Sequence, residues 1–127
     1  MGLIYEKELL KIGENLYPCT TSITMDYIGG KWKMVILYHL KNGPRRYSEL
    51  RKTMPTVTER TLSLQLKQLE EDGIVKREVF VSKPPLKVEY SLTEFGQTLV
   101  PLLDMIADWG RGVAKEKKAV IVSNSGV

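Results

Sequence analysis

Apolar residues recur every three or four positions in several stretches of the chain, which is the spacing of one face of a helix. The stretches are separated by residues that end helices, such as Gly29-Gly30 and Asn42-Gly43-Pro44. Ser48 and Thr58 are suitable N-caps for the third and fourth stretches. The pattern therefore predicts helices over residues 20–28, 31–41, 48–53 and 59–72.

After Gly73 the pattern becomes that of strands. Residues 74–81 are rich in β-branched side chains, and residues 87–92 alternate polar and apolar side chains. The intervening residues 82–86 contain two prolines, which are tolerated at the tip of a hairpin because no ladder hydrogen bond is needed there. A two-stranded hairpin with a basic tip is therefore predicted.

Helical spacing also occurs at both ends of the chain, and it is sustained in the C-terminal stretch. A long helix is predicted from Thr93 to residue 118, with a bend at Pro101, which has no N–H to donate. Residues 1–17 have loosely helical spacing and are interpreted as a short arm. The order of elements predicts a mainly α fold with a small β-hairpin (α+β), a winged helix-turn-helix with dimerisation helices at its N- and C-terminal ends. The expected parts are an arm and dimer contact (1–17), a DNA-binding core (18–92), a dimerisation helix (93–118) and a tail (119–127).

Composition excludes several classes of protein. The chain has 127 residues, 43% hydrophobic and 27% charged, as in an ordinary globular protein of one core. Its apolar runs are too short to span a membrane, and its acidic N-terminus does not resemble a signal peptide, so a cytoplasmic location without membrane contact is expected. Because Cys19 and His39 are the only residues of their types, we expect no disulfide framework, metal or other cofactor. No nucleophile–base pair is apparent, so the protein is not expected to be an enzyme.

Charge and periodicity together indicate binding to double-stranded DNA. Residues 45–67 hold six basic residues and two acidic ones, and the whole chain has a net charge of +4. If the leucines of the fourth helix face inward, its other face is polar and basic and suits a major groove. The flanking basic residues and the hairpin lysines are expected to meet phosphate. The candidate DNA-binding residues are Arg45, Arg46, Ser48, Thr58, Arg60, Thr61, Ser63, Leu64, Lys67, Lys83 and Lys87.

An alternative interpretation is that the polar face of the fourth helix is simply exposed to water. The domain would then serve protein–protein contact and have no affinity for DNA. Arg60 distinguishes the two hypotheses, because replacing it weakens DNA binding only under the first.

Several motifs in this order and spacing resemble the HxlR family of bacterial winged-helix regulators. They include Ile28-Gly-Gly-Lys-Trp-Lys33, Gly43-Pro-Arg-Arg-Tyr-Ser-Glu-Leu50, Leu66-Lys-Gln-Leu-Glu-Glu-Asp-Gly-Ile74 and Val88-Glu-Tyr-Ser-Leu-Thr93. The resemblance covers about residues 18–110. It implies a homodimer that binds a palindromic operator, mostly as a repressor and sometimes as an activator. Leu64 departs from the polar residue that the family often carries, so it either meets a thymine methyl group or has no role.

The last helix carries more apolar surface than one small domain covers, which predicts a partner helix in a dimer. Packing against the chain's own core is the alternative. The expected dimer residues are Phe95, Leu99, Leu102, Leu103, Ile106, Trp109 and Val113.

Cys19 precedes the first helix and matches a cysteine that serves some family members as a sensor of oxidants or electrophiles. The same residue is also interpretable as a small packing side chain, and both interpretations stay open. A sensor with one cysteine requires an intersubunit disulfide or a small-molecule adduct. The sequence does not identify the oxidant or small molecule that acts as effector.

Overall fold

The computed structural model describes residues 9–81 and 83–122. Parts of the predicted N-terminal arm, of the hairpin tip and of the C-terminal tail lie outside these ranges. The chain divides into two compact units, with the division between Lys31 and Trp32.

The first unit, Met1–Lys31, contains a hairpin and a helix. Strands β1 (Leu10–Ile12) and β2 (Asn15–Tyr17) pair antiparallel across a turn in which Gly13 has a φ of +57°. The loosely helical arm expected here is therefore wrong for these residues, because a tight turn with a left-handed glycine favours strand pairing over a helix. Helix α1 (Thr20–Ile28) has the predicted bounds.

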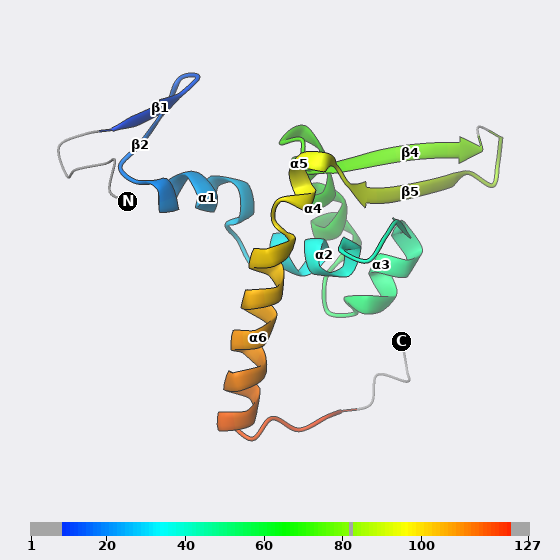
Figure 1. Ribbon diagram of the computed structural model, residues 1–127. Coiled ribbons are helices and arrows are strands. Elements are labelled where there is room, and N and C mark those ends of the chain that lie inside the picture. The colour runs from blue at the N-terminus through cyan, green and yellow to red at the C-terminus, as the bar shows by residue number, and fades with distance from the viewer. Residues whose placement is uncertain (1–8, 82, 123–127) are drawn as a thin grey trace. The chain divides into compact units, whose positions relative to one another are not determined.

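The second unit, Trp32–Val127, contains the remaining elements. Its helices and strands, shown in Figure 1, are α2 (Lys33–Leu40), β3 (Arg45–Arg46), α3 (Tyr47–Thr53), α4 (Glu59–Glu71), β4 (Val75–Val81), β5 (Lys87–Leu92), α5 (Glu94–Gln97) and α6 (Val100–Glu116). One apolar core joins them. Its fully buried side chains are Ile36, Leu37, Leu40, Leu50, Leu62, Leu66, Leu69, Ile74, Val75 and Leu103.

The sheet has three strands in the order β3-β5-β4, and all neighbours are antiparallel. Two strands were expected, because the two-residue β3 is too short to produce an alternating pattern. Arg45 pairs with Tyr90, so β3 ties the loop after α2 to the middle of β5. The β4–β5 hairpin extends beyond the helices of this unit, as a wing does (Figure 1).

The chain turns from α4 into β4 at Gly73, which has a φ of +76°. The N–H of Ile74 donates to the carbonyl of Leu69 at 3.0 Å, and the N–H of Gly73 donates to that of Glu70 at 3.0 Å. This is the pattern of a helix end closed by a left-handed residue, as the glycine predicts. Thr93, just after the end of β5, then joins the base of the wing to this turn, since its N–H donates to the carbonyl of Ile74 at 3.0 Å.

The predicted last helix is interrupted. Helix α5 ends at Gln97 and α6 begins at Val100, so Pro101 lies in the first turn of a new helix and not at a bend within one. Proline is favoured at this position, where the N–H would have no helical partner. Thr93 caps α5 by accepting a hydrogen bond from the N–H of Gly96 at 2.9 Å.

Gly96 is buried against the turn that follows α4. A Cβ at this position would collide with the carbonyl oxygen of Ile74. By contrast, a Cβ at Gly112 in α6 would meet nothing within 4 Å. Gly96 therefore has no room for a side chain, whereas Gly112 does.

We predict that Gly96→Ala lowers the free energy of unfolding by about 1–3 kcal/mol, because the backbone of Ile74 must shift. Gly112→Ala is the matched control and should raise it by about 0.5–1 kcal/mol, because alanine favours the helix. Chemical denaturation followed by circular dichroism measures both. Equal effects of the two substitutions would contradict the close packing of Gly96.

Candidate nucleic-acid interface

Helix α4 presents a polar face to solvent and an apolar face to the core. Leu62, Leu66 and Leu69 are buried. The side chains that the periodicity placed on the opposite face are exposed; they are Arg60, Ser63, Leu64 and Lys67. The predicted orientation of the helix is therefore confirmed.

The N-terminus of α4 is capped as the sequence predicts. The side chain of Thr58 accepts a hydrogen bond from the N–H of Thr61 at 3.1 Å. The Thr58 hydroxyl also donates to the hydroxyl of Thr61 at 3.0 Å. Both threonines thus take part in the cap, which fixes where the helix begins.

Helix α3 positions the start of α4 through Tyr47. Its hydroxyl donates to the carbonyl of Glu59 at 3.2 Å and accepts from the hydroxyl of Ser63 at 3.3 Å. Arg51 donates to the carbonyl of Val57 in the turn between the two helices. The sequence did not indicate these roles, because nothing in a linear pattern tells which carbonyl a tyrosine reaches.

Ser48 is not the N-cap of α3, which corrects the prediction. The helix begins one residue earlier, at Tyr47, and the N–H of Arg46 donates to the carboxylate of Glu49 at 2.7 Å. A glutamate at the third helical position accepts from the N–H of the capping residue, so this N–H is satisfied although Ser48 is not the cap. Ser48 is exposed within the first turn.

The candidate cations on α4 and on the short strand β3 are at least partly exposed. Arg46 and Arg60 are exposed and Arg45 is half-buried, with its guanidinium donating to the carbonyl of Pro44 at 3.1 Å. Within residues 9–81 and 83–122, no ion pair involves Arg45, Arg46, Arg60 or Lys67. These four cations are therefore not held by carboxylates in the described residues, and the helix dipole adds positive charge at the start of α4.

The wing adds two lysines at its tip. Lys83 is exposed, and the ammonium of Lys87 lies 5.6 Å from the centre of the Phe80 ring. Both residues belong to the same unit as α4. The structure thus combines in one unit the helix and the hairpin to which the sequence assigned DNA contacts.

Helix α6 exposes apolar side chains that the rest of its unit does not cover. Trp109 is 76% exposed, so it is not a core residue, and Ile106 is also exposed, as is Phe95 in the preceding helix α5. Leu99, Leu102 and Val113 are half-buried. Leu103, in contrast, is 1% exposed and packs within its own chain, so it is removed from the expected dimer surface.

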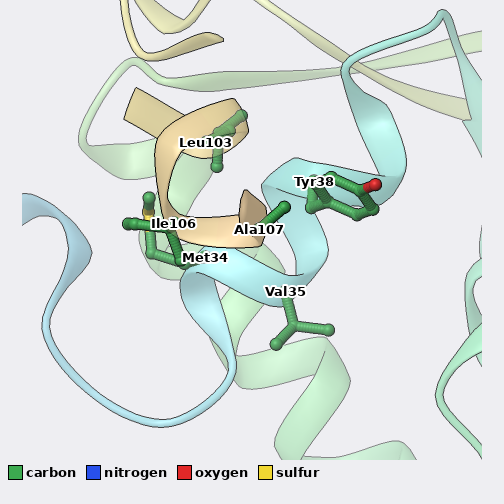
Figure 2. A pocket seen from close by; sticks show the side chains of 6 residues that line it. All are labelled: Met34, Val35, Tyr38, Leu103, Ile106 and Ala107. Carbon is green, nitrogen blue, oxygen red and sulfur yellow. The ribbon is translucent and has the colours of Figure 1, made fainter. Parts of the chain in front are cut away.

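An apolar pocket of about 200 Å³ opens beside this surface, between α2 and α6. Figure 2 shows side chains from both helices around it. They are Met34, Val35, Tyr38, Leu103, Ile106 and Ala107. Ile106 belongs to both the pocket and the exposed face of α6, so the two surfaces are continuous.

An ion pair joins α6 to the end of α2. Lys41 pairs with Asp104, and its ammonium also lies 5.2 Å from the centre of the Tyr38 ring. Both the carboxylate of Asp104 and the tyrosine raise the pKa of Lys41. These contacts hold α6 against the first helix of its own unit.

Cys19 is exposed and precedes α1, in the first unit. The backbone N–H of Ser22, aided by its side chain, hydrogen-bonds the sulfur and lowers the pKa of the Cys19 thiol. The packing interpretation of Cys19 is therefore disfavoured, because the side chain is not buried. A lowered pKa increases the thiolate fraction, which is the reactive form.

Other kinds of site find little support in the described part of the chain. No group of three or more potential metal ligands occurs among its His, Cys, Asp and Glu side chains. His39 is half-buried, and burial lowers its pKa, with Arg45 contributing. None of the helices described has the length and apolar character needed to cross a membrane.

Helices α2, α3 and α4 are followed by the β4–β5 hairpin, and α4 is capped and has one exposed face. This arrangement defines a winged helix-turn-helix protein. Comparison with known proteins agrees with this class. The sequence profile of the HxlR-like helix-turn-helix matches residues 27–118, and the chain belongs to this family.

Relatives and solved structures support the same assignment. The HTH-type transcriptional regulator YybR of Bacillus subtilis (strain 168) is 50% identical over 101 residues, which cover 76% of this chain and 80% of YybR. The redox regulator HypR in its oxidized form is 50% identical with a TM-score of 0.70, covering 74% of this chain and 96% of that one. The reduced regulator YodB of B. subtilis is 32% identical with a TM-score of 0.61, covering 71% of this chain and 87% of that one. The protein is therefore a member of a family of DNA-binding transcriptional regulators.

Proposed function

We propose that this protein is a sequence-specific transcriptional repressor that binds a palindromic operator in double-stranded DNA as a homodimer. The observation that carries the proposal is the capped helix α4, whose exposed face bears Arg60, Ser63 and Lys67 while its leucines are buried. A helix of this kind fits a major groove with its N-terminal residues at the base edges. Because the DNA lies in the cytoplasm of a bacterial cell, we expect the protein to act there.

The exposed residues of α4 are assigned to bases or to phosphate according to their distance from the N-terminus of the helix. Arg60 and Ser63 lie in the first two turns and are assigned to base edges, where an arginine prefers guanine. Lys67 lies a turn further on and is assigned to phosphate. Leu64 is exposed between them and is assigned to a thymine methyl group.

Residues outside α4 are assigned mainly to the phosphate backbone. Their charges or hydroxyls fix the position of the protein on the duplex without reading sequence. Because the hydroxyls of Thr58 and Thr61 already bond to each other, these two residues contribute first through the cap. The residues assigned to phosphate are Arg45, Arg46, Ser48, Lys83 and Lys87.

A second copy of the chain is the proposed cover for the exposed face of α6. Trp109 is large, aromatic and exposed, which is the character of an anchor residue in an interface. The adjoining pocket offers apolar surface that a partner side chain would fill. A dimer places two recognition helices about 34 Å apart, so each reads one half of a palindrome.

Cys19 is the proposed sensor residue. In the proposed reaction a peroxide oxidises the thiolate by two electrons to a sulfenic acid, and the peroxide oxygen that leaves becomes water or hydroxide. The sulfenic acid then condenses with Cys19 of the partner subunit, or with a small thiol, and releases water. Likeness to the redox regulator HypR supports this assignment.

We predict that Arg60→Ala weakens binding to the DNA flanking the protein's own coding region by about 10- to 100-fold, since a bidentate contact to guanine is lost. Fluorescence anisotropy across salt concentrations, with competitor DNA, measures this effect. Lys115→Ala, which also removes an exposed cation but lies near the end of α6, is the matched control and should bind as the parent does.

Weak binding that is the same for the parent and Arg60→Ala would contradict the proposal. The winged helix would then serve contact with another protein, and its polar face would only be a solvated surface. Lys67→Ala adds an independent measurement, because losing one phosphate contact reduces the salt slope by about one.

Trp109→Ala should raise the dissociation constant of the dimer by about 30-fold or more, because it removes a large apolar anchor. Sedimentation equilibrium over a range of protein concentrations measures the constant. Leu64→Ala truncates an exposed apolar side chain on α4 and should leave the dimer unchanged. The dimer surface is assigned wrongly if the two variants dissociate alike.

We predict that hydrogen peroxide changes operator affinity of the parent by about tenfold and has no effect on Cys19→Ser. Because the pKa of Cys19 is lowered, the rate of thiol alkylation should reach half its maximum at a pH below the ordinary pKa of a thiol. Mass spectrometry of the oxidised protein distinguishes an intersubunit disulfide from a small-thiol adduct. A Cys19→Ser variant that responds like the parent would end the sensor hypothesis.

A further inference from the structure

The tip of the wing carries apolar side chains that its own chain leaves uncovered. Phe80 is 54% exposed and Leu86 is 55% exposed, and Val79 and Val81 are also exposed. Two further apolar residues, Pro84 and Pro85, lie between them and are exposed as well. An exposed cluster of this kind marks a surface that meets a partner.

An irregularity in β4 sets Phe80 apart from the strand pairing. Val79 pairs with Val88 and Val81 pairs with Lys87, so Phe80 has no opposite residue in β5. Such a bulge redirects a side chain away from the regular alternation of the strand. The ring of Phe80 lies 5.6 Å from the ammonium of Lys87, so the structure places an apolar ring and a positive charge together.

The charge of the tip identifies the partner. Residues 79–88 contain Lys83 and Lys87 and no acidic residue, while the acids Glu78 and Glu89 lie nearer the base of the hairpin. An apolar surface flanked by two cations complements a polyanion that also offers apolar faces. Stacked bases between two rows of phosphate meet both conditions.

We propose that the wing is an apolar wedge, with Phe80 and Leu86 entering the minor groove beside the α4 site, partly unstacking one base step and bending the DNA. This inference rests on the proposed function, since it requires that α4 binds DNA. It adds a way of reading sequence that uses no hydrogen bonds to bases. Steps that unstack at low cost, such as TA, are favoured at the position of the wing.

The dimensions of the hairpin agree with entry by its tip alone. Paired strands lie about 4.8 Å apart, so a hairpin with its side chains is wider than a minor groove of about 6 Å. Individual side chains at the tip are narrow enough to enter. Lys83 and Lys87 then lie near the phosphates at the groove edges, where they favour insertion of the adjoining apolar residues.

The test measures DNA bending by the full-length protein. A duplex from the flanking region, labelled at both ends for energy transfer, reports the bend, and anisotropy reports affinity on the same DNA. Phe80→Ala should abolish most of the bend and weaken binding about tenfold, without changing the salt slope. Phe80→Leu should retain the bend, because leucine is also an effective wedge.

Two controls separate the wedge from charge and from general truncation. Lys83→Ala should lower the salt slope by about one and leave the bend angle unchanged. Ile121→Ala removes an almost fully exposed apolar side chain outside the wing and should behave as the parent does in both measurements.

A duplex with one mismatched pair at the wing position provides a second measurement. Because mismatched bases are easier to unstack, the parent should bind this duplex several-fold more tightly than the matched one, and Phe80→Ala should not.

If the parent and Phe80→Ala both bind tightly and bend the DNA by the same angle, the wedge proposal is overturned while the proposed function stays intact. In that case loss of self-association or of a protein partner in Phe80→Ala would assign the tip to protein contact. Failure of the parent to bind any duplex would overturn both proposals.

Discussion

The left-handed conformation of Gly73 lets the chain reverse from α4 into β4 while the backbone around Ile74 stays hydrogen-bonded. The carbonyl of Ile74 accepts from the N–H of Thr93, and the hydroxyl of Thr93 donates to the carbonyl of Gly73 at 2.5 Å. Gly96 packs so closely on this turn that no Cβ fits between them. This one turn thus joins the end of α4, the two strand ends at the base of the wing and the start of α5.

This connection joins α4 to the base of the wing, which is formed by β4 and β5. Ile74 and Val75 are fully buried at its base, whereas Phe80 and Leu86 are exposed at its tip. Burial at the base fixes the direction of the hairpin, and exposure at the tip leaves its side chains available. A wing joined to the helix at its base suits the proposed binding mode, in which α4 and the wing contact two neighbouring grooves.

Local signals in the sequence predicted most of the winged helix. Helix α1 and strand β5 have the predicted bounds, because glycines and alternation mark them within a few residues. The break before α6 was missed, because apolar spacing continues across Leu99 while only the capping geometry of Thr93 and the position of Pro101 reveal a new helix. Strands of two or three residues, such as β3, are too short to show any period.

The candidate site was less predictable than the fold, and its residues differ in how far they could be assigned. The exposed position of Arg60 follows from the helical period, so sequence sufficed. The bridge from Tyr47 to Glu59 depends on how two helices cross, and the bulge at Phe80 depends on strand register. Contacts between elements that are distant in sequence leave no local pattern.

In the proposed complex, the charge distribution along α4 favours one direction of this helix on DNA. Glu70, Glu71 and Asp72 gather at the end of α4, whereas Arg45, Arg46 and Arg60 lie at and before its start. Phosphate would be attracted to the first end by both the cations and the helix dipole and repelled from the other end. Reversing the helix in the groove would place three carboxylates against the backbone and move Arg60 away from the bases. The charge distribution along α4 therefore selects one orientation of the helix before any base is read.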